Sequence, residues 1–391
     1  MKVPSQRLAR AGLLGVVVAL AASVLVSPVA AASPPGLYVS QLHGSDANSC
    51  SSSQPCLTIG HAVSVAAAGA TIHVDQGTYH EQVSVTKRLT LVANHAVVDA
   101  TGLTGGIQPL AGMGIVGYGI LVYGPGASGS AVKGFTVQHA TGEGILVAGT
   151  SKIRIEGNTV SFNDAGFNTT VGRECQAQGN VPGDCGQAIH LLSTTWSHVT
   201  NNRVENNIGS ILVTDEVGPS AHNVISGNTS MIGILHGGIT LESRNPLALT
   251  EASMGGVYDN LVINNFSAGN EFGVGIFASL PGTASYNNRV IHNDLALNVE
   301  AGVEIHADAA GQNISGNTIV NNTIFGNGVD LDSGSGHPTG IALFSAVVPV
   351  TVAVTDNHIS GEFWGIFTAG PVTIHGLSSN HYSSSVTNHT N

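Results

Sequence analysis

A small set of acidic, basic and imidazole side chains recurs at equivalent places in a repeated strand-like phrase. The phrases read QAIHL, SILVT, GITLE, GIFAS and GVEIH, beginning at Gln187, Ser210, Gly238, Gly275 and Gly302. The residues of chemical interest in or just after them are His190, Asp215, Glu216, Thr240, Glu242, Arg244, Glu304, His306 and Asp308. Only 9% of the chain is charged, so this concentration indicates a candidate site.

Carboxylates dominate this set, and paired carboxylates at roughly 5 to 10 Å are what glycoside hydrolysis requires. The candidate catalytic residues are Asp215, Glu242, Arg244, Glu304 and His306, and the candidate substrate-binding residues are His190, Glu216, Thr240 and Asp308. Arg244 could also neutralise a uronate carboxylate or act as a base. Several carboxylates without a thiolate suit a Ca²⁺ site as well. The alternative is that outward polar residues serve solubility, and that Asp215–Arg244 is a surface ion pair worth at most about 1 kcal/mol.

The elements that must position these residues are the coils of a repeat. Seven phrases end in Asn, at Asn158, Asn202, Asn228, Asn265, Asn293, Asn322 and Asn357, and five of them are followed by a second Asn, at Asn163, Asn207, Asn270, Asn298 and Asn327. A repeat of this length predicts a solenoid whose coils bury their apolar faces against their neighbours. Apolar and polar residues alternate with a period of two, which predicts strands. Asn suits the corners between strands and predicts a stacked Asn ladder inside the coil.

Aligning the phrases on their Gly-Ile step predicts two outward columns on one sheet. The first column is Leu146, His190, Leu212, Thr240, Phe277, Glu304 and Ala342, and the second is Ala148, Leu192, Thr214, Glu242, Ser279, His306 and Phe344. Neighbouring coils lie about 4.8 Å apart, so Glu242 and His306, two coils apart, are expected near 10 Å. Asp215 and Arg244 stand on successive coils and are expected to touch.

This pattern resembles the right-handed parallel β-helix of the pectin-lyase-like superfamily over nearly the whole mature chain. The resemblance implies an all-β solenoid of roughly ten coils with a short N-terminal capping helix. The Asn-Thr-Asp, Asp-Asp, Gly-His-Gly and Arg-Ile-Lys motifs of secreted polygalacturonases do not occur here, nor does the Arg-x-Pro-x-x-Arg element of pectate lyases. The resemblance therefore covers the scaffold and carries no catalytic residue. The Asn-rich coils also resemble those of periplasmic proteins implicated in copper-enzyme maturation, although Cu favours His or Met clusters.

The chain divides into four predicted segments. Residues 1–32 are expected to be a signal peptide, because Lys2, Arg7 and Arg10 precede an apolar run and a small-residue stretch. Residues 33–70 form an entry segment with the cap helix. Residues 71–377 form the β-helix, with insertions at about 163–187 and 243–259 that could wall one groove. Residues 378–391 are expected to be a loose tail or a thin cap.

Export and charge restrict the partners. Without the three basic residues of the leader, nine basic residues face 24 acidic ones, a net charge near −15, which disfavours nucleic acid and anionic membranes. In an exported chain, four cysteines favour the disulfides Cys50–Cys56 and Cys175–Cys185, although three connectivities are possible and a zinc site is the rival interpretation.

These features predict a secreted, extracellular or periplasmic protein that cleaves a polysaccharide, by lyase or hydrolase chemistry, in a groove along one sheet. The partner would be an extracellular polysaccharide, with no membrane span after leader removal. The alternatives are a non-catalytic glycan-binding or surface-structural β-helix, and a periplasmic metal-maturation protein.

Overall fold

The structure, a computed structural model, describes residues 34–107, 116–164, 186–233, 237–245, 248 and 255–391. The predicted leader and Cys175–Cys185 lie outside these residues, as does most of the predicted insertion at 163–187. No helix in the described part of the chain is long and apolar enough to cross a membrane.

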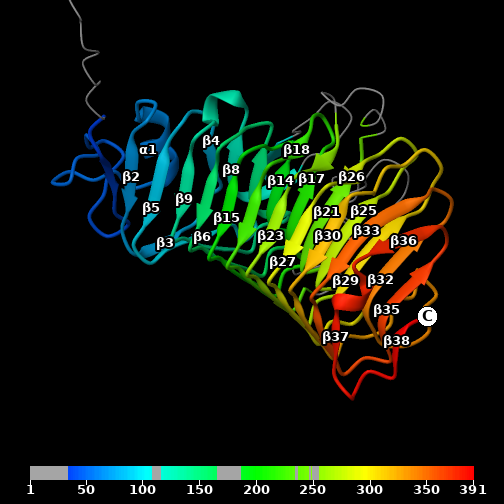
Figure 1. The fold of residues 1–391 in the computed structure, drawn as a ribbon. Helices are drawn as coiled ribbons and strands as arrows, with labels where there is room; N and C mark the ends of the chain where they lie inside the picture. The colour runs from blue at the N-terminus through cyan, green and yellow to red at the C-terminus, as the bar shows by residue number, and fades with distance from the viewer. Residues whose placement is uncertain (1–33, 108–115, 165–185, 234–236, 246–247, 249–254) are drawn as a thin grey trace, which may run out of the picture. The chain divides into compact units, whose positions relative to one another are not determined.

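Three parallel sheets make up the described fold, and successive strands of the chain alternate among them (Figure 1). Sheet 1 consists of β1 (Leu37–Val39), β2 (Thr71–Val74), β5 (Thr90–Ala93), β9 (Ala131–Lys133), β12 (Arg154–Glu156), β15 (His198–Thr200), β19 (Val224–Ser226), β23 (Leu261–Ile263), β27 (Arg289–Ile291), β30 (Asn317–Val320), β33 (Val350–Thr355) and β36 (Val372–His375). Sheet 2 consists of β3 (Gly77–Tyr79), β6 (Ala96–Asp99), β10 (Thr136–Gln138), β13 (Thr159–Ser161), β16 (Arg203–Glu205), β20 (Thr229–Met231), β24 (Phe266–Ala268), β28 (Asp294–Ala296), β31 (Thr323–Phe325), β34 (His358–Ser360) and β37 (His381–Tyr382).

Sheet 3 carries the predicted site residues. It consists of β4 (Val83–Val85), β8 (Val116–Tyr123), β11 (Glu143–Ala148), β14 (Gln187–Leu192), β17 (Gly209–Thr214), β21 (Ile239–Ser243), β25 (Val274–Ala278), β29 (Val303–Ala307), β32 (Thr339–Ser345), β35 (Trp364–Ala369) and β38 (Asn388–Thr390). The short β7 (Gly106–Ile107) pairs antiparallel with β8. A small sheet of β18 (Ser220–Ala221), β22 (Val257–Tyr258) and β26 (Ser285–Tyr286) fills one corner.

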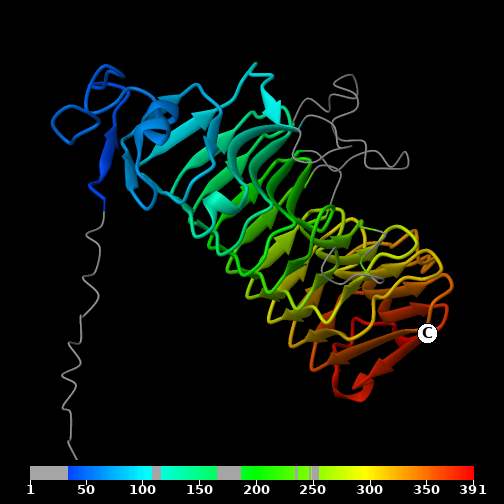
Figure 2. The same ribbon diagram turned by 90° about the horizontal axis from the view of Figure 1, so that it is seen from above.

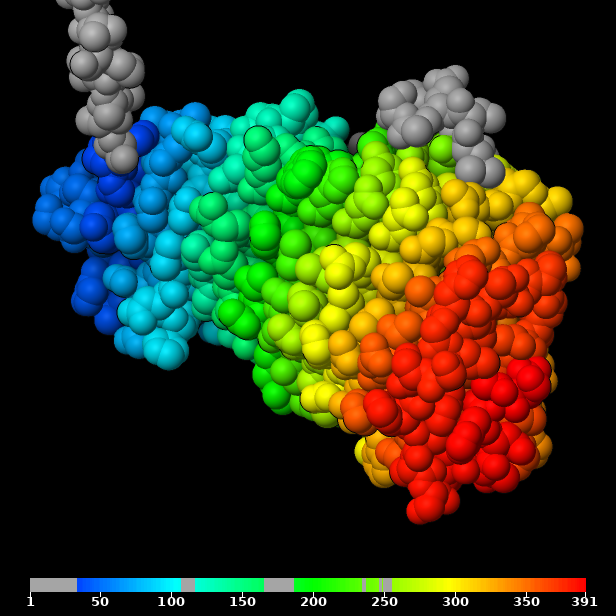
Figure 3. Space-filling view, in the orientation of Figure 1, coloured from blue at the N-terminus to red at the C-terminus, as the bar shows by residue number. Residues whose placement is uncertain are grey.

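This arrangement is the predicted right-handed parallel β-helix. The colours of Figures 2 and 3 follow one another from blue to red in bands, as expected when each coil packs on its neighbours. Apolar residues at alternate strand positions, such as Ile239 and Leu241, point inward and form one continuous core.

The Asn ladder is confirmed and has more members than the repeat phrases predict. In the main ladder each Asn donates its backbone N–H and its side-chain amide to Oδ1 of the next, from Asn158 through Asn357 to Asn380. The second ladder joins Asn163 to Asn207, and Asn270 through Asn298 to Asn327. These bonds satisfy the polar groups that the corners bury.

A third ladder was not predicted. Asn223, Asn260, Asn288 and Asn317 are linked in the same way, and each precedes a main-ladder Asn by five residues. This spacing of five fits one short strand between two corners, and it was visible in the sequence.

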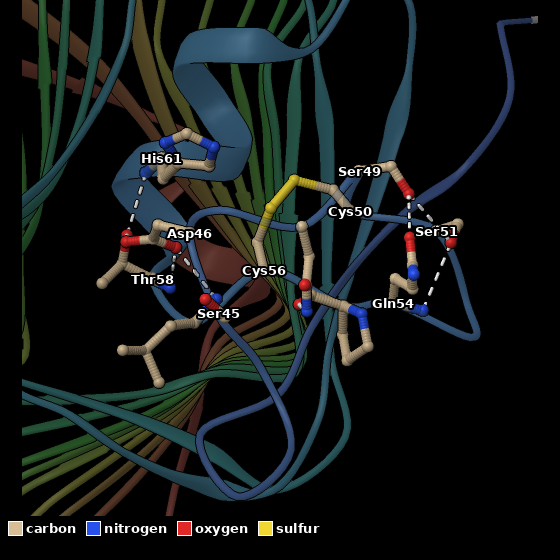
Figure 4. Close-up of a disulfide and its surroundings, with 12 residues drawn as sticks. Ser45, Asp46, Ser49, Cys50, Ser51, Gln54, Cys56, Thr58 and His61 are labelled. Carbon is tan, nitrogen blue, oxygen red and sulfur yellow. Dashed lines mark hydrogen bonds between the residues drawn. A yellow bond between two sulfur atoms is a disulfide. The ribbon is translucent and has the colours of Figure 1, made fainter.

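The N-terminal end is capped as predicted. Helix α1 (Ile59–Val65) begins after Thr58, whose hydroxyl accepts a hydrogen bond from the His61 N–H. Ile59, Ala62 and Val63 are buried in the core at this end. The predicted Cys50–Cys56 disulfide is present beside the helix, as Figure 4 shows.

The C-terminal segment differs from the predicted loose tail. It contains η2 (Leu377–Ser379), β37 and β38, which pair with β34 and β35, and Asn380 extends the main ladder. Serine and asparagine are abundant there because they build corners and ladder positions rather than a disordered end.

Candidate functional site

The register of sheet 3 brings most of the predicted residues onto one outward face. Thr214 pairs with Glu242, Glu242 with Phe277, and Phe277 with His306, so Glu242 and His306 stand two coils apart as predicted. The prediction was wrong in one coil: Gly275, not Phe277, lies between Thr240 and Glu304. The Gly-Ile step of that coil lies two residues later than in its neighbours.

The outward face of sheet 3 is far more buried than a groove requires. Strands β11, β14 and β17 are buried at every position, whereas sheets 1 and 2 alternate between buried and more exposed residues. His190 is 4% exposed and Glu304 2%. The groove was predicted along the part of the sheet that holds Thr240, Glu242, Glu304 and His306. Of these, Thr240 and Glu242 are partly exposed, whereas Glu304 and His306 are buried. The apolar members of the outward columns, such as Leu146 and Leu192, form a second buried cluster and explain part of this burial.

Glu242 and Arg244 form the most accessible polar pair of this face in the β17–β21 region. Their side chains, two residues apart at the end of β21, meet with Arg244 Nη2 2.5 Å from Glu242 Oε2, and each is 13% exposed. Ser279 of the next coil donates its hydroxyl to Glu242 Oε1. Glu242 is thus held by a neighbour on each side.

Burial sets the protonation of this pair. It raises the pKa of Glu242 to about 7; the Ser279 hydrogen bond opposes this rise, and the charges of Glu216 and Asp215 add to it. Burial likewise lowers the pKa of Arg244 to about 10. Glu242 can therefore exchange a proton near neutral pH, while Arg244 stays charged.

A buried hydrogen-bonded chain of Thr214, His190 and Glu143 lies one, two and three coils before Glu242. His190 Nδ1 is 3.1 Å from Glu143 Oε1, and its Nε2 is 2.8 Å from Thr214 Oγ1. Burial acts to lower the pKa of His190, but the hydrogen bond and charge of Glu143 raise it above its usual value. His190, predicted to bind substrate, is therefore held inside the protein, and Glu143 is its partner.

Asp215 was predicted to be catalytic, but in the structure its carboxylate binds backbone and hydroxyl groups at the end of β21 and in the segment that follows it. Its carboxylate accepts hydrogen bonds from the backbone N–H groups of Arg244, Asn245 and Gly256 and from the Ser243 hydroxyl. The predicted contact with Arg244 exists, but through the backbone of Arg244. Because four donors occupy its oxygens, Asp215 holds the two ends of the 243–259 segment together rather than facing a ligand.

A second cluster surrounds Glu304 and His306. His306 Nε2 lies 2.9 Å from Asp330 Oδ2, and the imidazole stands between the rings of Phe277 and Phe344. Burial, followed by the charge of Asp330, raises the pKa of Glu304 well above its usual value. Asp308 is exposed beyond the end of β29, and Thr240 is half-buried on β21.

Glu300, Glu304 and Asp330 offer the best donor set for a metal ion among the described residues. One carboxylate oxygen of each lies within 4.8 Å of the others. Such oxygens are the ligands that hard cations such as Ca²⁺ prefer. The other grouping found there, Cys50, Cys56 and His61, contains the disulfide and offers no thiolate.

Several participants were missed in the sequence. Glu143 immediately precedes a Gly-Ile step, and the alignment that found His190 would have reached it. Asp330 belongs to a loop between β31 and β32, and only the pair of acids in the letters DLD signals it. Ser279 was predicted directly opposite Glu242, but Phe277 takes that place and Ser279 lies two residues further along the chain. Its hydroxyl still reaches Glu242.

Comparison with solved structures supports the fold. The chain is similar to pectate lyase Pel9A, with a TM-score of 0.55 and 16% identity, covering 90% of this chain and 80% of that one. It is also similar to an alginate lyase from Paenibacillus sp. str. FPU-7 (TM-score 0.47, 12% identity, 85% and 96% covered) and to PfbA, a surface adhesin of Streptococcus pneumoniae (TM-score 0.49, 14% identity, 84% and 87% covered). At 16% identity, the similarity to Pel9A shows the fold alone.

Sequence comparison gives the family. No curated protein matches the chain. The family model described as periplasmic copper-binding protein (NosD) matches residues 127–337, which is more than half of the chain and spans both clusters of sheet 3. The chain therefore belongs to the NosD family, on the scaffold of the pectin-lyase-like β-helix proteins that its repeats resemble.

Proposed function

We propose that this protein acts outside the cytoplasm, in the periplasm or the extracellular space, and hydrolyses a polysaccharide with Glu242 as the proton donor. The observation that carries the proposal is the state of Glu242: a partly accessible carboxyl with a pKa of about 7, held between Arg244 and Ser279. A carboxyl of this kind can protonate a glycosidic oxygen at neutral pH.

Glycoside hydrolysis requires a second carboxylate. Glu216, just beyond β17 on the preceding coil, is close enough for its charge to raise the pKa of Glu242. Burial raises the pKa of Glu216 as well, and the reaction requires Glu216 to be ionised while Glu242 is protonated. In this proposal Glu216 is the base or nucleophile.

Hydrolysis is favoured over elimination by the position of Arg244. A lyase needs a cation free to neutralise a uronate carboxylate, or a base beside the sugar. The Arg244 guanidinium is already paired with Glu242, and its pKa of about 10 keeps it protonated at neutral pH. It is better placed to orient Glu242 than to abstract a proton.

The test is a panel of neutral, acidic and amino polysaccharides incubated with the full chain, followed by reducing ends and by the absorbance of unsaturated products. Hydrolysis produces reducing ends without unsaturation. Glu242→Gln should lower the rate by about 10²- to 10⁴-fold, as expected for a lost general acid. Glu205→Gln is the matched control, because Glu205 pairs with Arg203 at the same two-residue spacing and 2.5 Å distance on sheet 2. Retention of a glycan without cleavage would favour a binding protein instead.

A copper-related function is the second candidate, because the family description names copper binding. The described residues do not fit copper well. Their best donor group consists of carboxylates, whereas copper favours imidazole, thiolate and thioether ligands. Of the four methionines only Met231 lies in the described part of the chain. Copper retained stoichiometrically by purified protein after dialysis would favour this candidate.

A further inference from the structure

The first coil of the β-helix is covered by other parts of the chain. The outer edge of β1 is hydrogen-bonded to the disulfide-bearing loop, since the Tyr38 N–H donates to the Cys50 carbonyl and the Cys56 N–H donates to the Tyr38 carbonyl. The side-chain amide of Gln41 bonds both the N–H and the carbonyl of Thr78 on β3. Helix α1 packs against β4. The first strand of each of the three sheets is therefore covered.

In the described part of the chain, the last coil has no such cover. It contains β36, β37 and β38, the final strands of sheets 1, 2 and 3, at the red end of Figure 1. Among the described residues, no loop or side chain is hydrogen-bonded to the outer edges of these strands as Gln41 is to β3. Their outer backbone N–H and C=O groups can therefore pair with a further strand.

The apolar layer of the last coil is partly exposed as well. Val372 and Ile374 of β36 are aligned with Val350 and Val352 of β33. The β33 pair is buried, at 1% and 0% exposure, whereas the β36 pair is only half-buried. Elsewhere in the repeat the following coil covers such residues, so this layer lacks the neighbour against which a solenoid coil packs.

A buried hydroxyl group in the same coil also lacks a partner. The Tyr382 hydroxyl on β37 is shielded from solvent and has no hydrogen-bond partner among the described residues. Tyr382 and Leu377 help to line a hollow of about 490 Å³ between η2, β37 and β38. Because a buried polar group without a partner is costly, this hydroxyl points to a contact that the single chain does not supply.

The sequence of this coil lacks the charges that normally keep strand edges apart. Residues 363–391 contain no Asp, Glu, Lys or Arg, although the whole chain has 24 acidic and 12 basic residues. Exposed edge strands usually carry such charges, Lys above all, which prevent pairing with another chain. Two copies of an acidic chain repel each other over much of their surface, but a surface without these residues can meet its own copy.

We propose that two copies of this chain associate through their last coils, with β36, β37 and β38 as the contact surface. The covered first coil prevents head-to-tail stacking, so the contact is last coil to last coil about a two-fold axis, which closes as a dimer. An axis that crosses β36 at a right angle sets this strand antiparallel to its copy. Val372 and Ile374 of both copies then cover each other, and the two Thr373 side chains lie close together.

A strand matches this surface better than a lipid or a saccharide does. Lipid would cover Val372 and Ile374 but would leave the backbone edges unpaired. A saccharide could bond the edges, but its hydroxyl groups would not bury the apolar layer. The inference is independent of the proposed hydrolase activity, because β36, β37 and β38 carry no residue of the Glu242 site.

Sedimentation velocity of the full chain across the micromolar range tests the inference. The mass should rise with concentration from one chain to two and no further, because a two-fold contact closes. Thr373→Lys, at an exposed position of β36, brings like charges together across the axis and should raise the dimer dissociation constant at least about tenfold. Thr323→Lys is the matched control, because Thr323 is equally exposed on β31, which is paired on both sides, and it should leave the constant unchanged.

Hydrogen exchange of the unaltered protein, measured above and below the dissociation constant, tests the location of the contact. The backbone amides of β36, β37 and β38 should exchange more slowly in the dimer, and those of β1 and β3 should not change. A chain that stays monomeric overturns the inference, as does a mass that continues to rise beyond two chains or a dimer that protects amides elsewhere. Unchanged association of Thr373→Lys, once circular dichroism shows that it folds, overturns it too; if that variant does not fold, the exchange measurement decides.

Discussion

Glu143 Oε1 lies 3.1 Å from His190 Nδ1, although 47 residues separate the two in the chain. Both side chains are buried, at 1% and 5% exposure, on the adjacent strands β11 and β14. Removing one partner of a buried pair leaves the other uncompensated. Glu143→Ala should therefore lower the free energy of unfolding by about 3–5 kcal/mol, and His190→Ala by a similar amount.

The double variant tests whether the two residues act as a unit. Glu143→Ala with His190→Ala should cost much less than the sum of the single changes, as measured by urea unfolding. The matched control is His222 with Asp259, an exposed pair at 3.9 Å, whose coupling should not exceed about 1 kcal/mol. Additive effects at Glu143 and His190 would show that their hydrogen bond contributes little.

The proposed acid predicts the pH dependence of cleavage. Glu242 donates a proton only while protonated, so the rate should fall as pH rises through about 7. Ser279→Ala removes a hydrogen bond that lowers the pKa of Glu242, so the falling limb should move to higher pH. The measurement is a pH–rate profile of both proteins on the same substrate. A limb that stays at the same pH in Ser279→Ala would assign it to another group.

The acids near β29 predict how stability depends on pH. Burial and like charges raise the pKa of Glu271 and of Glu300 to about 7 each, above the unfolded value of about 4.5. Between these values the folded protein binds more protons than the unfolded chain, so stability falls as pH rises from about 4.5 to 7. Thermal melting across this range should show the decline, and Glu300→Gln should flatten it. Glu205→Gln, on the exposed face of sheet 2, should leave the slope unchanged.

The fold could be predicted because it is repeated. Every coil buries its apolar residues in the same way, so one correct alignment of Ile239 and Leu241 with their counterparts places the whole sheet. Asn at the corners can be predicted equally well, because a buried corner requires a side chain that both donates and accepts hydrogen bonds. The third ladder was missed because Asn223 and its counterparts were not aligned separately from the main ladder. Asn380 was missed because it lies in the segment that was expected to be a loose tail.

The site could be predicted only in part, because burial does not follow from the repeat. The alignment put Glu242 and His306 on one face correctly, but it could not show that His190 is enclosed or that Asp215 binds a backbone turn. The burial of His190 and the backbone contacts of Asp215 depend on segments that interrupt the repeat. The alignment of the repeats does not place the residues of such insertions. Asp330, which meets His306, comes from such a segment.

The ladder itself makes a stability prediction at Asn265. Its Oδ1 accepts from the backbone N–H and side-chain amide of Asn228, and its amide donates to the Ile225 carbonyl and to Asn293. Asn265→Ala leaves buried partners unsatisfied on both neighbouring coils, at about 1–3 kcal/mol for each orphaned group. The total loss in the free energy of unfolding should reach at least about 3 kcal/mol, measured by urea unfolding. The control is Asn264→Gly at the adjacent exposed position, where φ is 56° and glycine fits without strain. If Asn265→Ala lowers the free energy of unfolding no more than this control does, the ladder does not stabilise the coil.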